Sequence, residues 1–156
     1  MTTTAPNPSN DVTIRPAEQA DLLAVYRIEK SSFPQPWPFD AFQRFLDAPG
    51  FLVATEGQKV TGYVVADCIP NHGRGIGHVK DIAVHPKRRG QGIGRRLLAR
   101  AIATLASQNA TSVKLEVRET NDVAKDLYRD FGFEPLRRIP RYYDDGEAAL
   151  VMVKEL

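Results

Sequence analysis

The sequence holds one cysteine and no long apolar run. Because Cys68 has no second cysteine to pair with, an intrachain disulfide and a Cys-x-x-Cys metal site are excluded, and its apolar, alternating surroundings predict a small core residue. No apolar stretch is long enough to cross a bilayer, and the first residues lack the basic and apolar blocks of a secretory signal. We therefore expect a cytoplasmic protein with a disordered N-terminal tail at residues 1–10.

An excess of charge of one sign is also missing. Lys and Arg number 21 against 19 Asp and Glu, so the net charge of +2 gives no global nucleic-acid signature, and we expect no direct nucleic-acid binding. No cluster of His, Asp or Cys has metal-ligand spacing, so we expect no metal. An apolar content of 42% over 156 residues without internal repeats predicts a single globular domain at residues 11–156.

The most informative stretch is DIAVHPKRRGQGIGRRLLAR, at residues 81–100. An apolar, β-branched segment (Ile82, Ala83 and Val84) leads through basic residues into alternating glycines at residues 90–94. From Ile93 onward, apolar residues recur at helical spacing, which predicts a strand, a basic glycine loop and a helix. A helix start offers unpaired N–H groups and a positive dipole end, and glycines let a ligand approach the backbone. The stretch therefore predicts an anion site suited to phosphate.

Two familiar phosphate motifs do not fit this loop. The dinucleotide fingerprint fails because Leu97 stands at its last glycine position, and no Gly-Lys-Ser/Thr of a P-loop follows. The pattern Arg/Gln-x-x-Gly-x-Gly/Ala does fit, at Arg89, Gly92 and Gly94. That pattern is the pyrophosphate motif of the GNAT acyl-CoA N-acyltransferases, which the sequence resembles here. An ordinary basic strand-to-helix turn is the alternative.

Hydrophobic periodicity predicts the other elements. We expect strands at residues 11–16, 51–55, 60–69, 78–84, 112–118, 133–137 and 148–154, and helices at 17–33, 39–46, 93–105 and 122–131. Prolines 34, 36 and 38 make residues 33–38 an extended loop. The resulting order, β-α-α-β-β-β-α-β-α-β-β, predicts an α+β fold with a central, mostly antiparallel sheet flanked by helices. The same order is found in the GNAT fold.

Two longer blocks narrow the resemblance. LEVRETNDVAKDLYRDFGF at residues 115–133 and RYYDDGEAALVM at residues 141–152 are similar to blocks of the N-terminal protein acetyltransferases, in both the bacterial ribosomal-protein alanine branch and the archaeal catalytic-subunit branch. The resemblance implies transfer from acetyl-CoA to the α-amino group of protein N-termini, by direct attack in a ternary complex. Ribosomal proteins are candidate substrates, and ribosome association is a further expectation. The chain departs from the family pattern at Ala148, which replaces an acidic residue, and at Gln35, where archaeal relatives can carry one.

The resemblance also implies residue roles. Glu116 is a candidate general base that alternation places opposite the aliphatic face of its strand, and His78 is the rival base; a solvated glutamate and a satisfied polar histidine are the alternatives. Tyr128 would protonate the CoA thiolate, or else serve as a core aromatic. The expected cofactor residues are Ile82, Ala83, Val84, Arg89, Gly90, Gln91, Gly92, Ile93, Gly94, Arg95 and Asn121, the last also a candidate helix cap. The expected walls of the substrate groove are Phe33, Trp37, Tyr142 and Tyr143, of which the first two could instead form a hydrophobic plug.

Several functions stay open at this point. The acceptor could be a small amine or a lysine side chain instead of a protein N-terminus. The chain could also be a regulatory module that binds acyl-CoA without turnover, or an RNA-associated factor recruited through its basic patches. Asp145 and Glu147 could attract a positive amine or could form a solvated hairpin tip.

Overall fold

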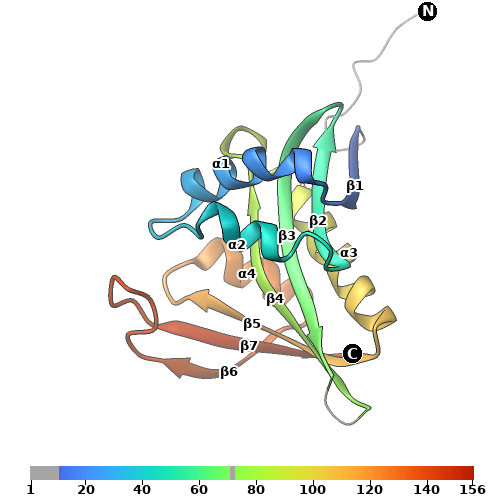
Figure 1. Cartoon of the computed structure of the whole chain (residues 1–156). Helices are drawn as coiled ribbons and strands as arrows, with labels where there is room; N and C mark the ends of the chain where they lie inside the picture. Colours follow the sequence, from blue (N-terminus) through green and yellow to red (C-terminus); the bar gives the residue numbers. More distant parts are fainter. Residues whose placement is uncertain (1–10, 71–72) are drawn as a thin grey trace, which may run out of the picture. The chain divides into compact units, whose positions relative to one another are not determined.

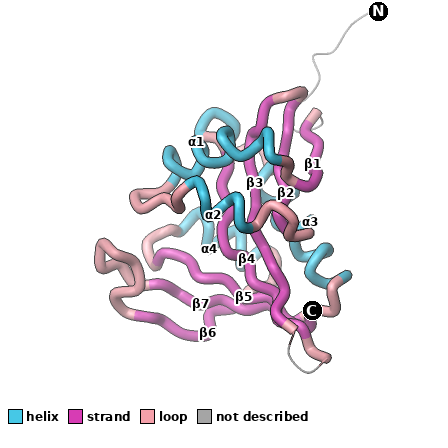
Figure 2. The backbone as a smooth tube through the Cα atoms, viewed as in Figure 1, coloured by secondary structure: helices cyan, strands magenta, loops and turns pink. Residues whose placement is uncertain are grey.

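The computed structural model describes residues 11–70 and 73–156, so the tail predicted at residues 1–10 lies outside them. The described residues form a seven-stranded sheet in the order β1-β2-β3-β4-β5-β7-β6 (Figures 1 and 2). The strands are β1 (Val12–Pro16), β2 (Gly50–Glu56), β3 (Lys59–Ile69), β4 (Gly75–Val84), β5 (Ala110–Arg118), β6 (Glu134–Ile139) and β7 (Ala149–Glu155). The helices are α1 (Leu22–Ser32), α2 (Phe39–Arg44), α3 (Ile93–Ser107) and α4 (Asp122–Asp130), with single 3-10 turns η1 (Gln19–Asp21) and η2 (Pro86–Arg88).

The strand pairing confirms the predicted α+β fold. Strands β4 and β5 pair in parallel, whereas the pairs β1–β2, β5–β7 and β6–β7 are antiparallel. Several predicted boundaries differ from the structure by one or two residues, and two differ by more. The helix expected from residue 17 begins as the turn η1 and becomes α-helical only at Leu22. Strand β4 starts at Gly75 rather than His78, because Gly75 and Gly77 continue the pairing with β5 instead of forming a loop.

By its internal contacts the chain divides into two compact units. The described residues of the first unit are 11–65 and 81–101, and those of the second are 66–70, 73–80 and 102–156. Strands β3 and β4 and helix α3 contribute residues to both units. The single domain predicted for residues 11–156 remains a prediction.

The first unit packs helices on both faces of its strands. Helices α1 and α2 cover one face, where Phe42 lies at ring-centroid distances of 6.2 Å from Phe51 and 5.6 Å from Tyr63. Helix α3 begins on the other face, where a Cβ atom on Gly62 would lie only 3.1 Å from a Leu97 methyl carbon. Figure 1 shows α1 and α2 in front of β2 and β3. This packing supports the strand end and glycine loop that precede α3.

The second unit separates an aliphatic face from a polar one. Along β5 the residues Val113, Leu115 and Val117 are buried, and the intervening residues are partly exposed. Leu105 of α3 packs on the aliphatic face, where it would lie 2.8 Å from a Cβ on Gly77. The opposite face is the one on which polar side chains of β4 and β5 meet. Over residues 11–70 and 73–156, no helix combines the length and apolar character needed to cross a membrane.

Candidate active site

The polar face of the second unit brings the two predicted bases together. The side chains of His78 on β4 and Glu116 on β5 meet, with Nε2 of the histidine 2.6 Å from Oε2 of the glutamate. Each side chain is only 16% exposed. The Lys114 ammonium lies 3.7 Å from the other carboxylate oxygen of Glu116. The residues that the sequence offered as rivals are therefore hydrogen-bonded partners.

The electrostatics of this pair distinguish the two groups. The hydrogen bond from His78 lowers the pKa of Glu116 against the opposing effect of burial, and the charges of His78 and Lys114 lower it further. A carboxylate with a lowered pKa stays ionised at neutral pH and is a weak proton acceptor. When the neutral imidazole carries its hydrogen on Nε2, its Nδ1 atom has a lone pair. The carboxylate can thus fix the tautomer of the histidine and leave Nδ1 as the basic nitrogen.

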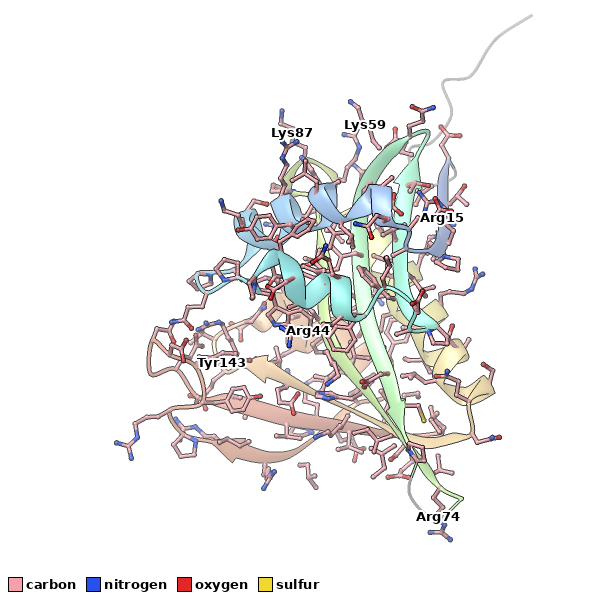
Figure 3. All side chains as sticks on the ribbon, viewed as in Figure 1. Arg15, Arg44, Lys59, Arg74, Lys87 and Tyr143 are labelled. Atoms are coloured by element: carbon pink, nitrogen blue, oxygen red, sulfur yellow. The ribbon has the colours of Figure 1, made fainter. Side chains whose placement is uncertain are left out.

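A cation from β5 organises the loop between β6 and β7. Nη1 of Arg118 donates to Oδ2 of Asp145 at 2.8 Å and to Oε1 of Glu147 at 2.9 Å. The guanidinium also lies 4.1 Å from the ring centroid of Tyr143, which Figure 3 labels. The backbone N–H groups of Tyr142 and Tyr143 both donate to the carbonyl of Glu147 at 3.1 Å. This network brings the two predicted tyrosines together and holds them in a defined loop.

The acidic side chains of Asp145 and Glu147 in this loop are paired with Arg118 of β5. Hydrogen bonds from the hydroxyl and backbone N–H of Thr120, followed by that from Arg118, lower the pKa of Glu147 to about 2. Because Arg118 engages both acidic residues, the predicted attraction of a substrate amine by Glu147 is weakened. Burial raises the pKa of Tyr143 to about 12. Burial and then the charge of Glu116 raise the pKa of Tyr142, whose side chain is 47% exposed.

Helix α4 carries two more predicted site residues, and both also have structural roles. Tyr128 is buried, with its ring edge-on to Phe133 at a centroid distance of 5.9 Å. Asn121 caps the helix, because its side-chain oxygen accepts from the N–H of Ala124 at 3.2 Å. The predicted helix cap is thereby confirmed. The roles of both residues toward a cofactor remain predictions.

The first unit contains the glycine loop as predicted between a strand and a helix. Gly90 and Gly92 have φ angles of +78° and +83°, which side chains on L-residues rarely tolerate, although a Cβ at either position would meet no atom within 4 Å. Glycine is therefore required here by backbone conformation. The Arg89 guanidinium braces the loop by donating to the carbonyl of Val84 at 3.1 Å and to the hydroxyl of Ser32 at 3.0 Å.

The loop fits an anionic ligand. It leads directly into α3, whose first turn leaves backbone N–H groups without intrahelical acceptors. The side-chain oxygen of Gln91 is buried without a hydrogen-bond partner among the described residues. Rotation of that amide would place an NH₂ donor at the same position. The preceding residue triplet, 82–84, includes a buried Ala83 between two half-buried neighbours.

The loop of residues 33–38 is partly a hydrophobic plug. Phe33 and Trp37 are half-buried and pack against the core of the first unit. The Trp37 ring lies 5.4 Å from that of Phe42 and 5.8 Å from that of Phe45. The plug that the sequence offered as an alternative is thus present, and a role for these two aromatics in a substrate groove remains a prediction.

An acidic cluster in the first unit, centred on the buried Glu29, was not predicted from the sequence. Glu29 is only 2% exposed; one carboxylate oxygen accepts from the Tyr63 hydroxyl and the other accepts from the N–H of Trp37 at 2.8 Å. The Tyr63 hydroxyl oxygen also lies 3.3 Å from Oδ2 of Asp81. The available signal was that Glu29 shares its helical face with apolar residues of α1.

Comparisons with known proteins identify the family of the chain. The model of the acetyltransferase (GNAT) family matches residues 22–133. The chain belongs to this family. An N-alpha-acetyltransferase from Sulfolobus acidocaldarius is 35% identical over 92% of this chain and 92% of its own. The ribosomal protein bS18-alanine N-acetyltransferase of Escherichia coli is 30% identical over 90% of this chain and 95% of its own.

A solved structure gives the same result for the fold. The crystal structure of Ard1 from Thermoplasma volcanium superposes with a TM-score of 0.87 at 28% identity, over 94% of this chain and 98% of that chain. The fold, the family and the enzyme class predicted from the sequence, an acetyl-CoA-dependent N-acetyltransferase, are therefore confirmed.

Proposed function

We propose that this acetyltransferase acts on the α-amino group of protein N-termini and uses His78 and Glu116 together to deprotonate it. The single observation that carries the proposal is the 2.6 Å contact between the two side chains on the polar face of β4 and β5. Two half-buried groups of this kind form a proton-accepting site that needs no metal. The names of the archaeal and bacterial relatives support an N-terminal acceptor.

The proposed reaction assigns each group one task. Glu116 accepts a hydrogen bond from the Nε2–H of His78 and stays ionised. The free Nδ1 atom of His78 then takes a proton from the acceptor ammonium, directly or through water. The uncharged amine attacks the thioester carbonyl, which backbone N–H groups of residues 82–84 hold. The C–N bond forms and the C–S bond breaks without a covalent acyl-enzyme. Tyr128 gives its hydroxyl proton to the departing CoA thiolate and regains a proton through solvent, while the nitrogen loses its second proton to solvent as the amide forms.

The proposed binding residues also have one task each. Residues 89–95, with the N–H groups at the start of α3, hold the pyrophosphate of acetyl-CoA. Asn121 uses its oxygen as the helix cap, so its NH₂ group is the part that would contact the cofactor. Tyr142 and Tyr143, and also Phe33 and Trp37, line the path of the acceptor peptide. Because the Escherichia coli relative is named for a ribosomal-protein alanine, N-termini that begin with alanine are the first candidates, with ribosome association as a further possibility.

Acetyl-CoA turnover on short peptides tests the proposal. Peptides that begin with Ala, Ser, Met-Leu and Met-Glu are compared with spermidine and with lysine peptides whose N-termini are blocked. We expect acetylation only where a free α-amino group is present, and the preferred first residue indicates which relative this chain resembles in specificity. Turnover confined to spermidine or to blocked lysine peptides would refute an N-terminal acceptor.

A further inference from the structure

The cluster of Glu29, Tyr63 and Asp81 has no part in the reaction just described. Glu29 and Tyr63 are among the largest fully buried side chains of the described residues. Burying a carboxylate is costly unless hydrogen bonds compensate for the lost water. Here the two oxygens of Glu29 accept from two different donors, the Tyr63 hydroxyl and the Trp37 N–H. A leucine or methionine would fill a similar volume without this cost, so the value of the carboxylate lies in what it binds.

Asp81 completes the cluster. The Tyr63 hydroxyl donates to Glu29, and its oxygen also lies 3.3 Å from Oδ2 of Asp81, so one hydroxyl faces two carboxyl groups. Burial, followed by the hydrogen bond and the charge of Glu29, raises the pKa of Asp81. The two acids and the hydroxyl therefore form one hydrogen-bonded cluster.

Few backbone hydrogen bonds can hold the loop of residues 33–38. Prolines at 34, 36 and 38 have no backbone N–H, so between residues 34 and 38 only Gln35 and Trp37 have one. Glu29 accepts from the second of these donors. This hydrogen bond fixes the backbone of a loop whose aromatic side chains also pack against the core.

We propose that Glu29 is a positioning residue for the acceptor substrate: its carboxylate, held by Tyr63 and Asp81, fixes residues 33–38 through the N–H of Trp37. The proposal rests on the proposed function only in taking this loop as a wall of the acceptor path.

Trp37 provides a direct test, because it is the only tryptophan of the chain. In Glu29→Gln, the amide can accept from only one of the two donors and turns its NH₂ group toward the other. We expect red-shifted Trp37 fluorescence with greater acrylamide quenching in the free enzyme. We also expect the KM for the acceptor peptide to rise about tenfold while the KM for acetyl-CoA stays within about twofold. Glu29→Met, which lacks both strong acceptors, should behave in the same way.

A surface variant and the pattern of the kinetic changes complete the test. The control Glu155→Gln, at an exposed position of β7, should leave both readouts near wild type. Unchanged fluorescence and peptide KM in both Glu29 variants would overturn the proposal. A uniform loss, with lower kcat and equal increases in both KM values, would also overturn it by indicating a merely structural role. If the wild type acetylates no peptide but the fluorescence still shifts, the proposed function fails and the loop anchor stands.

Discussion

The hydrogen bond between His78 and Glu116 leads to a quantitative prediction about catalysis. Replacement by Glu116→Gln retains the size of the side chain but removes the charge that holds the imidazole. A hydrogen bond to a charged group contributes about 1.5–3 kcal/mol when one partner is lost. If that contribution is expressed in the transition state, kcat falls about 100-fold, which corresponds to about 2.7 kcal/mol. His78→Gln removes the proposed proton acceptor and should cost at least as much.

The double variant distinguishes a coupled pair from two independent groups. Because the carboxylate acts through the imidazole, the double variant should be no slower than His78→Gln alone. Rates are measured as CoA thiol release at saturating acetyl-CoA and peptide, with Glu134→Gln on β6 as an exposed control of the same substitution. Losses that multiply in the double variant, or a fully active His78→Gln, would refute the coupled base.

The pH dependence of the rate provides a second readout on the same pair. The pKa of Glu116 lies below its ordinary value of 4.5, so a direct carboxylate base would stay active down to below that pH. A rate that is lost only below pH 4.5 would therefore identify Glu116 as the direct base and would contradict the assignment of His78 as the proton acceptor.

Two other predictions follow from the structure. Gly92 has a φ of +83°, so Gly92→Ala should lower the free energy of unfolding by about 1–2 kcal/mol and the Tm by a few degrees. The same substitution should weaken acetyl-CoA binding measured by calorimetry. Gly94→Ala is the control and should be tolerated, because the motif accepts alanine at that position. The pKa of Glu147 is depressed from 4.5 to about 2, so its stabilising contribution is present above pH 4.5 and is lost as the pH falls toward 2. The Tm difference between wild type and Glu147→Gln should therefore shrink over that range; a constant difference would argue against the ionised network with Arg118.

Local sequence patterns predicted those parts of the fold that depend on neighbouring residues. The alternation of β5 placed Glu116 opposite Val113, Leu115 and Val117, and the burial of the strand agrees. The glycines before α3 located the loop because a left-handed backbone restricts the choice of residue at Gly92. Element ends were less predictable: 3-10 geometry at η1 and the pairing of Gly75 depend on contacts that periodicity does not contain.

The contacts within the site depend on strand register, which the sequence does not specify. His78 and Glu116 are 38 residues apart, and they meet because the parallel pairing sets His78 opposite Lys114, two residues before Glu116. A shift by one residue would have turned one of the two side chains to the aliphatic face. Alternation could therefore predict that each side chain lies on the polar face of its strand. It could not predict that the two side chains would form a hydrogen bond.

The acidic side chains of this protein differ in the direction in which their surroundings shift their pKa values. Glu116 and Glu147 have lowered pKa values because cations or hydrogen-bond donors face them, so at neutral pH they act as fixed charges. Asp81 has a raised pKa because desolvation and the adjacent Glu29 carboxyl group disfavour its charged form. An ionised Glu116 is a weak proton acceptor at neutral pH, and this supports our proposal that the imidazole of His78 takes the proton during turnover while Glu116 orients it.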